Sequence, residues 1–248
     1  MKLLLPVLAA ILLLVSCGDP EDAAVRHDPL PVSEKDTAFV AVPGGTFIRE
    51  NGDTVEIEAF RLGRYEVTNR LYYHLAEEGG VQLPPDPEFT GMEDYFYDYP
   101  GYPVVNVSME EASAAAAVLG GRLPTDAEWQ YAASLGLEDG PEENWAWGTL
   151  PPVEAEYPAN YLAGDEWETR GLDGYLWTAP VDSFPLTDEG FACFSGNVAE
   201  WTLAPFDSLV PVRGGAWLSP ADEIMLDARR RLAPGDRARH IGFRILLP

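Results

Sequence analysis

Gly196-Asn197-Val198-Ala199-Glu200-Trp201 opens the stretch that decides the fold, Val212-Arg213-Gly214-Gly215-Ala216-Trp217 follows it, and Ile241-Gly242-Phe243-Arg244 ends it. Glycine turns, tryptophans and arginines recur here in an order that overall composition does not explain. Large aromatic side chains anchor cores more often than they line pockets. We therefore expect Trp201 and Trp217 to be buried, and the stretch to lie at the centre of one domain.

The N-terminus carries the features of a secretion signal. Lys2 precedes the apolar run Leu3–Val15, and residues 1–16 are too short to span a bilayer comfortably. Ser16-Cys17 at the end of that run resembles the lipobox of bacterial lipoproteins, so we expect Cys17 to be lipidated. An ordinary signal peptide that happens to contain a cysteine is the alternative. The lipoprotein interpretation predicts a chain anchored in the bacterial cell envelope, on the periplasmic face or at the cell surface. It does not decide between the inner and the outer membrane.

Composition narrows the function further. Residues 17–37 are rich in Asp, Glu and Pro, which predicts a disordered tether before a single domain over residues 38–248. Once Cys17 is lipidated, Cys193 is the only thiol left, which excludes an internal disulfide and a cysteine-rich metal site. A net charge of −25 argues against nucleic acid and anionic membrane surfaces as partners.

The arginines are concentrated in the last part of the chain. From Arg213 onward there are seven arginines, against the four acids Asp222, Glu223, Asp227 and Asp236. Guanidinium groups commonly fix irregular segments by pairing with carboxylates. We favour internal pairing, with a patch for an anionic ligand as the alternative.

Local signals predict strands first and helices next. Residues 38–42 are expected as a strand, and Asn51-Gly52 as the turn of a hairpin formed by residues 46–49 and 54–60. Three helix starts are recognisable by their capping residues, two of them as capping boxes, Ser108 with Glu111 and Thr125 with Glu128. The expected helices start at residue 70 and end before Gly79-Gly80, and cover about 109–119 and about 126–135. Residues 82–103 are expected to form a long surface loop, and regular periodicity is nearly absent after Gly136.

Four further motifs precede the opening stretch, and together the five give a family resemblance over residues 39–244. They are Phe39-Val40-Ala41-Val42-Pro43-Gly44-Gly45-Thr46-Phe47, Tyr65-Glu66-Val67-Thr68-Asn69, Pro103-Val104-Val105-Asn106-Val107-Ser108 and Gly121-Arg122-Leu123-Pro124-Thr125-Asp126-Ala127-Glu128-Trp129. In this order they resemble the formylglycine-generating enzyme, or sulfatase-modifying factor, family. The resemblance implies an α+β fold related to the C-type lectin fold, with much irregular chain.

The residues that carry the family's oxidative chemistry are missing. Its catalytic members oxidise a sulfatase cysteine with two copper-binding cysteines placed after the Arg-Gly-Gly turn, and here those positions hold Ser219 and Ile224. Cu(I) requires soft thiolate ligands, so no copper is expected. Related iron-dependent sulfoxide synthases use a histidine set, whereas this chain has only His27, His74 and His240. We therefore predict no catalytic residues of either kind, and leave open whether the chain is an enzyme.

Calcium is the metal that the resemblance does imply. The family's first site corresponds to the side chains of Asn160 and Asp173 and the carbonyl groups of Tyr161 and Tyr175, ahead of Ala179-Pro180-Val181. Oxygen ligands of this kind suit calcium. The alternative is that Asn160 and Asp173 only cap turns.

A second calcium site is implied less strongly. Glu200 and the carbonyl groups of Gly196 and Val198 match it, but Cys193 stands where the family has an oxygen donor. The alternative is a Glu200 carboxylate held by an arginine or by backbone N–H groups, and the two interpretations are evenly balanced.

The sequence favours a lipid-anchored, non-catalytic binding or scaffold module, a pseudoenzyme whose ligand is an envelope protein, a peptide or another molecule. Its ligand surface is expected at Ser219, Asp222, Glu223, Arg229 and His240. The alternative is a PvdO-like envelope enzyme that modifies a peptide or natural product without the cysteine pair, and a formylglycine-generating oxidase comes third. A cleft that gathers these side chains with perturbed protonation favours the enzyme, and a convex face favours the binding module.

Overall fold

The computed structural model describes residues 30–49, 52–138, 140–142, 144–152, 158–163, 171–204 and 209–248. The predicted signal sequence, Cys17 and His27 lie outside the described residues, as does Asn51 of the predicted turn. No helix in the part of the chain that the structure describes is both long and apolar enough to cross a membrane.

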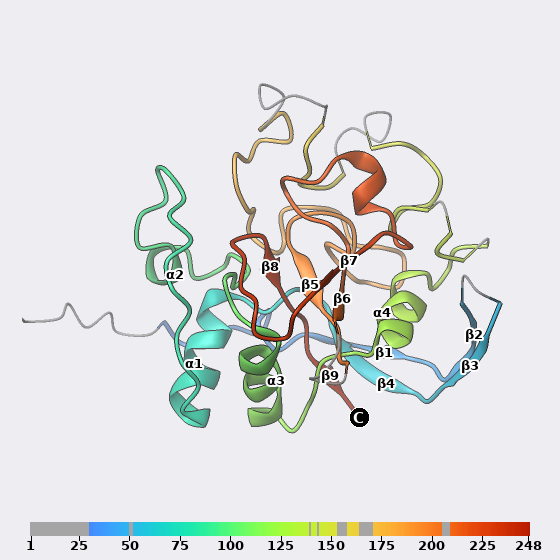
Figure 1. Ribbon diagram of the computed structural model, residues 1–248, viewed down its shortest axis with the longest axis horizontal. Helices are drawn as coiled ribbons and strands as arrows, with labels where there is room; N and C mark the ends of the chain where they lie inside the picture. The colour runs from blue at the N-terminus through green and yellow to red at the C-terminus, as the bar shows by residue number, and fades with distance from the viewer. Residues whose placement is uncertain are drawn as a thin grey trace, which may run out of the picture.

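The first strands bring the two ends of the domain together. β1 (Phe39–Val42) pairs antiparallel with β4 (Phe60–Gly63), and β4 pairs in turn with β9 (Leu246–Leu247) near the C-terminus. The predicted hairpin is present as β2 (Gly45–Ile48) and β3 (Thr54–Ile57), which project from the body of the domain (Figure 1). Its second strand was predicted to run through residue 60, but Phe60 begins β4 instead.

The predicted helices are confirmed, and their capping groups explain where they begin. α1 (Asn69–Gly79) starts after Thr68, whose hydroxyl accepts a hydrogen bond from the N–H of Leu71. Both predicted capping boxes are formed, at the starts of α3 (Met109–Val118) and α4 (Asp126–Ala133). α4 ends two residues earlier than about 135, as predicted boundaries often do.

The segment 82–103 is mostly irregular and not buried, as predicted, but it is tied to the core at several points. It contains the short helix α2 (Tyr95–Asp98), and Phe89 and Tyr95 are buried. The Asn69 amide at the start of α1 donates to the carbonyl oxygen of Tyr99 at 2.9 Å. Aromatic burial and this side-chain amide replace regular backbone pairing in holding the segment.

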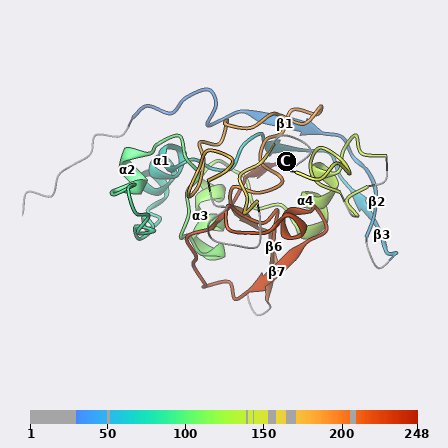
Figure 2. The same ribbon diagram turned by 90° about the horizontal axis from the view of Figure 1, so that it is seen from above.

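The opening stretch forms a second sheet, where almost no regular structure was predicted. β5 (Ala199–Trp201), β6 (Val210–Arg213), β7 (Arg229–Leu232) and β8 (Ile241–Gly242) are arranged in the order β7-β6-β5-β8, with β5 and β8 parallel. A 3-10 helix, η2 (Ala221–Ile224), lies between β6 and β7 along the chain. Strands of two to four residues are too short to show an alternating pattern, which is why the sequence does not reveal them. In the view from above, β7 lies at the rim of the molecule (Figure 2).

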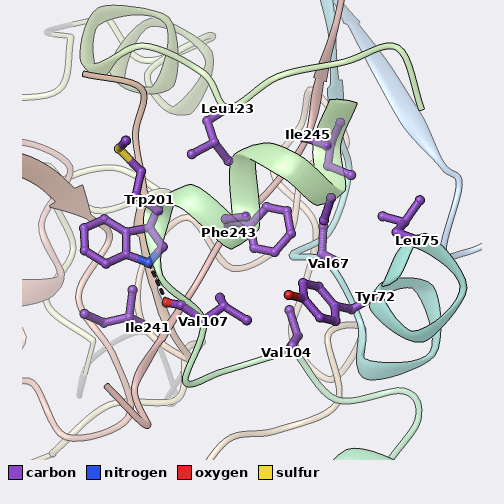
Figure 3. Packing of buried hydrophobic residues seen from close by; sticks show 14 of the residues in the cluster. Val67, Tyr72, Leu75, Val104, Val107, Leu123, Trp201, Ile241, Phe243 and Ile245 are labelled. Carbon is purple, nitrogen blue, oxygen red and sulfur yellow. Dashed lines mark hydrogen bonds between the residues drawn. The ribbon is translucent and has the colours of Figure 1, made fainter. Parts of the chain in front are cut away.

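The core joins the second sheet to helices α1 and α3 (Figure 3). Trp201 is fully buried and its indole N–H donates to the carbonyl oxygen of Val107 at 2.9 Å. Tyr72 from α1 meets Phe243 edge-to-face, with ring centroids 6.2 Å apart. Trp217 is also buried, so both tryptophans lie in the interior as predicted.

The predicted tether is too long at its C-terminal end. Residues 30–37 were assigned to it, yet Asp36 accepts a hydrogen bond from the hydroxyl of Thr68 at 2.5 Å and lies 3.5 Å from Arg70. Lys35 also forms an ion pair with Asp182. The acidic composition that suggests disorder supplies, at Asp36, the carboxylate that attaches this segment to the start of α1.

Candidate functional site

A cavity of about 230 Å³ lies against the second sheet. Small and aliphatic side chains make its floor; Ala199, Val212, Leu232 and Ile241 come from four separate strands, and Ala238 lies in the connection between β7 and β8. Polar and charged side chains complete the lining, namely Ser219, Glu223, Arg229, Arg230 and His240. An apolar cavity with a few polar groups is the usual form of a small-ligand site.

Four of the five residues predicted as the ligand surface line this cavity. They are Ser219, Glu223, Arg229 and His240. The fifth, Asp222, is not among the described residues that line the cavity. Arg230 and the apolar residues of the cavity floor were not predicted from the sequence. The only local signal for them is the sequence Arg229–Leu232, in which apolar Leu232 lies on the same strand face as Arg230.

Burial sets the charge of the histidine. The pKa of His240 falls to about 4 because burial disfavours the imidazolium, and nearby Arg230 and Arg239 oppose the charge further. The ring is therefore neutral at physiological pH and can donate or accept a hydrogen bond. Arg230 and Glu223 pair at 2.5 Å and are both exposed. The cavity thus presents neutral and charged polar groups above an apolar floor.

The two positions that correspond to the family's cysteines both follow the Arg-Gly-Gly turn, and they lie in different surroundings. Ser219 faces the cavity and its hydroxyl oxygen accepts a hydrogen bond from the N–H of Ala216 at 3.2 Å. Ile224 is fully buried and packs in a cluster with Trp145 and Tyr161. A hydroxyl and an aliphatic side chain supply no thiolate, so these residues do not fit copper.

Most of the C-terminal arginines pair with carboxylates, as predicted. Arg213 is fully buried and contacts both carboxylate oxygens of Asp126, at 2.6 and 2.9 Å. Arg230, Arg237 and Arg244 also pair with acids. Arg239 lies over the rings of Trp177 and Trp217 instead, 5.3 and 5.9 Å from their centroids. Within the described residues, internal pairing therefore accounts for at least four of the seven arginines.

Glu200 is held by an arginine and not in the manner of a calcium ligand. Its carboxylate is fully buried, and Arg244 contacts its two oxygens at 2.7 and 2.6 Å. The indole N–H of Trp129 donates to the same carboxylate at 2.7 Å. A guanidinium already neutralises the charge that a cation would use, so Glu200, Gly196 and Val198 do not fit a second calcium site.

Glu66 is a buried acid that sequence reasoning did not single out. Its carboxylate accepts hydrogen bonds from the Asn197 amide at 2.9 Å and from the N–H of Val198 at 3.3 Å. Burial raises the pKa of Glu66 to about 8, and the charge of Glu200 adds to the rise while Arg244 opposes it. The only signal in the sequence is an acid between Tyr65 and Val67, just before the helix cap Thr68.

The residues predicted for the first calcium site come together. The Asp173 carboxylate accepts hydrogen bonds from the N–H groups of Tyr161 and Tyr175, at 3.1 and 3.0 Å. The Asn160 amide nitrogen donates to the carbonyl of Trp177 at 2.7 Å, while its oxygen is buried without a hydrogen-bond partner among the described residues. An amide oxygen without a partner and a carboxylate are donor types that fit calcium. The hydrogen bonds of Asp173 also match the turn-capping alternative.

The two histidines that the structure describes do not lie together. His74 on α1 contacts the carbonyl oxygen of Leu30 at 2.9 Å, whereas His240 lies in the cavity. In the described part of the chain, no three His, Cys, Asp or Glu side chains are grouped so as to hold a metal.

Comparison with known proteins identifies the family. Residues 26–247 match the sulfatase-modifying factor enzyme 1-like domain. The chain is 28% identical to a formylglycine-generating enzyme of Thermomonospora curvata, over 88% of this chain and 95% of that protein. It is 32% identical to the inactive C-alpha-formylglycine-generating enzyme 2 of Bos taurus, over 88% and 75%. The structure of PvdO from Pseudomonas aeruginosa superposes with a TM-score of 0.65 at 25% identity, over 84% and 93%. The chain therefore belongs to the sulfatase-modifying factor, or formylglycine-generating enzyme, family.

Proposed function

We propose that this protein is a binding module whose ligand occupies the cavity over β7-β6-β5-β8. The observation that carries the proposal is the cavity itself, about 230 Å³ with an apolar floor, with Ser219 in its wall at the family's first cysteine position. The second position is the buried Ile224, so the site keeps a space for a ligand without the copper-binding pair. The resemblance to an inactive bovine relative supports a role without formylglycine formation.

The lining indicates the chemistry of the ligand. Leu232, Val212 and Ile241 offer contact to an apolar body, and Arg229 and Arg230 stand nearby for an anionic group. The chain as a whole is strongly acidic, so this local cationic charge favours anions at the cavity over other parts of the surface. We infer a ligand that is apolar with an acidic end.

A fluorescent apolar anion, 8-anilinonaphthalene-1-sulfonate, tests the cavity in the full-length chain. We expect saturable binding with one probe per chain. Ala238 lines the cavity, so Ala238→Trp should fill it and abolish binding. Ala114 is exposed on α3, and the matched Ala114→Trp should bind like the wild type. Equal binding by both variants would place the probe elsewhere and overturn the proposal.

The second candidate is a PvdO-like enzyme acting at the same cavity. The observation that favours it is that His240, whose pKa is lowered, lines the same cavity as Ser219. The sign of an enzyme given above is thus met at one side chain, and for that reason the enzyme is kept as the second candidate. The similarity to PvdO supports it. Incubating the chain with its producing organism's small-molecule and peptide extract separates the two. A new product that forms with the wild-type chain and does not form with His240→Asn would establish the enzyme. If mass spectrometry recovers the bound ligands unchanged, the binding module is supported.

A third possibility, formylglycine generation, is tested directly. The chain is incubated with copper and a cysteine-containing sulfatase peptide, and the aldehyde is sought by mass spectrometry. We expect no aldehyde, because positions 219 and 224 supply no thiolate. An aldehyde formed at a rate that depends on copper would overturn both the proposed function and this expectation.

We also propose a structural calcium ion held by Asn160 and Asp173 side chains and the carbonyl groups of Tyr161 and Tyr175. Calcium there would join two segments that are irregular in the fold. Metal content after native purification tests this, with melting temperature before and after chelation as a second measurement. We expect calcium to be lost in Asp173→Ala but kept in Asp222→Ala. Equal calcium in both variants would contradict the assignment.

Lipid anchoring is the last part of the proposal. Cys17 would carry the lipid and place the domain in the cell envelope, with the membrane contacted through that anchor alone. Cells fed a labelled fatty acid should label the wild-type chain and not Cys17→Ser. Label that persists in the variant would show that Cys17 is not the attachment site.

A further inference from the structure

The outer edge of β7 carries three consecutive exposed arginines. They are Arg229, Arg230 and Arg231, and β7 is the last strand of the sheet β7-β6-β5-β8. Among the described residues no other strand pairs with that outer edge. Figure 2 shows β7 at the rim of the molecule. An edge strand of this kind offers backbone groups to another extended chain.

Strand register shows which backbone groups face outward. Arg231 lies opposite Pro211 of β6. The carbonyl oxygen of Pro211 accepts hydrogen bonds from the N–H and hydroxyl of Thr202, at 3.3 and 2.7 Å, so it points toward β5. Proline has no N–H to offer β7. The pair Pro211–Arg231 is therefore not joined by hydrogen bonds, and the N–H and C=O of Arg231 face the outer edge.

Side chains on this strand alternate between two faces. Arg230 and Leu232 lie on one face of β7, toward the cavity described above, and Arg231 lies on the opposite face. Arg229, the first residue of the strand, also lines the cavity. An added strand would therefore place alternate side chains beside the cavity. An acidic side chain of the added strand would lie near an arginine on either face of β7, because the consecutive residues Arg230 and Arg231 lie on opposite faces.

We propose that the edge of β7 binds an extended acidic segment of a partner protein as an added antiparallel or parallel strand, with one apolar side chain of that segment reaching the cavity. Charge complementarity selects this partner, because β7 is a cationic segment on a chain of net charge −25. The inference rests on the proposed function for its cavity contact, whereas the backbone pairing is independent of it. The exposed Arg230–Glu223 ion pair contributes little and can yield to an incoming carboxylate.

Edge protection is the competing explanation of the arginines, since charged edge strands resist aggregation. Isothermal titration calorimetry on the full-length chain separates the two, with acetyl-Asp-Val-Asp-Val-Asp-Val-amide as the probe. Two control peptides are used, one with lysine in place of aspartate and one with the same sequence and N-methylated amides. We expect the acidic peptide to bind, and both controls to fail, because one reverses the charge and the other cannot donate hydrogen bonds to β7.

Matched variants locate the binding. Arg231→Glu should weaken the acidic peptide by about tenfold or more, since a like charge faces it. Arg61→Glu, an exposed arginine on central strand β4, should change binding by less than about twofold. Circular dichroism checks that both variants fold, and Arg231→Gln is used if Arg231→Glu does not.

The outcomes are separable from those of the cavity test. No binding of the acidic peptide, equal binding of the N-methylated peptide, or equal weakening in Arg61→Glu would each overturn the proposal and leave edge protection as the role of the arginines. If the peptide binds to β7 while the anilinonaphthalene probe does not enter the cavity, strand addition holds and the cavity function fails. If Ala238→Trp leaves peptide affinity unchanged, the apolar side-chain contact in the proposal is refuted.

Discussion

Glu66→Gln should abolish most of the pH dependence of stability near neutral pH. The wild-type carboxyl group is buried, and its pKa rises from the ordinary 4.5 to about 8. Between these pH values the unfolded chain releases this proton while the folded chain retains it. The free energy of unfolding therefore falls as pH rises through this window, and levels off above it.

The magnitude follows from the size of the pKa change. At roughly 1.4 kcal/mol per pH unit, raising the pKa of Glu66 from 4.5 to about 8 corresponds to about 5 kcal/mol lost across the window. Glutamine keeps a hydrogen-bond acceptor for the Asn197 amide but cannot ionise. It places an amide group near the N–H of Val198, so some stability is lost at every pH. The slope against pH is accordingly the quantity to compare.

Chemical denaturation of the two chains at pH 5, 6, 7 and 8 measures that slope. We expect the free energy of unfolding of the wild type to fall more steeply with pH than that of Glu66→Gln, by roughly 1 kcal/mol per pH unit. Other titrating groups affect both chains alike, so the difference reports Glu66. Parallel curves would refute the reasoning, because they would mean that Glu66 is ionised in the fold and that Arg244 serves two carboxylates.

Three further predictions concern other buried or capping groups. Arg244→Met should lower the free energy of unfolding by about 3 to 5 kcal/mol, because it leaves the Glu200 carboxylate buried without its partner; denaturant titration measures this, and a loss below about 1 kcal/mol would contradict it. Ser108→Ala should cost about 1 kcal/mol by removing the cap of α3; Thr37→Ala, at an exposed position, is its control, and an equal loss in both variants would contradict the capping explanation. His240→Gln should flatten the fall in stability on acidification between pH 6.5 and about 4, because the unfolded imidazole takes up a proton that the buried ring resists; unchanged acid titration curves would show that the ring is charged in the fold.

The helices could be predicted because their signals are local. Ser108 with Glu111 and Thr125 with Glu128 mark the helix starts within four residues, and the structure forms both capping boxes. The second sheet could not be predicted from periodicity, because its strands have two to four residues. Tertiary pairing decides such short strands, and no window of sequence contains that pairing.

The cavity residues could be predicted only where they follow a recognisable motif in the sequence. Ser219, Glu223, Arg229 and His240 were placed by their positions after the Arg-Gly-Gly turn, and they do line one cavity. The floor comes from separate strands. The hydrogen bond between Asn197 and Glu66 joins residues 131 positions apart. A contact between residues so far apart in the sequence leaves no local signal, so the burial of Glu66 could not be predicted from the sequence.

The Arg-Gly-Gly turn is required by the fold itself. Gly214 and Gly215 have φ values of 85° and 63°, and a Cβ on Gly214 would approach the carbonyl oxygen of Phe194 to 2.9 Å. Packing and backbone conformation therefore require both glycines, whatever the domain does. Position 224 carries no such requirement for a thiol, and Ile224 fills it as a core side chain. Restoring cysteine there would exchange buried aliphatic volume for a smaller group at a cost of about 1 to 3 kcal/mol. The turn is thus fixed by the fold, whereas no comparable backbone requirement fixes the residue type at position 224.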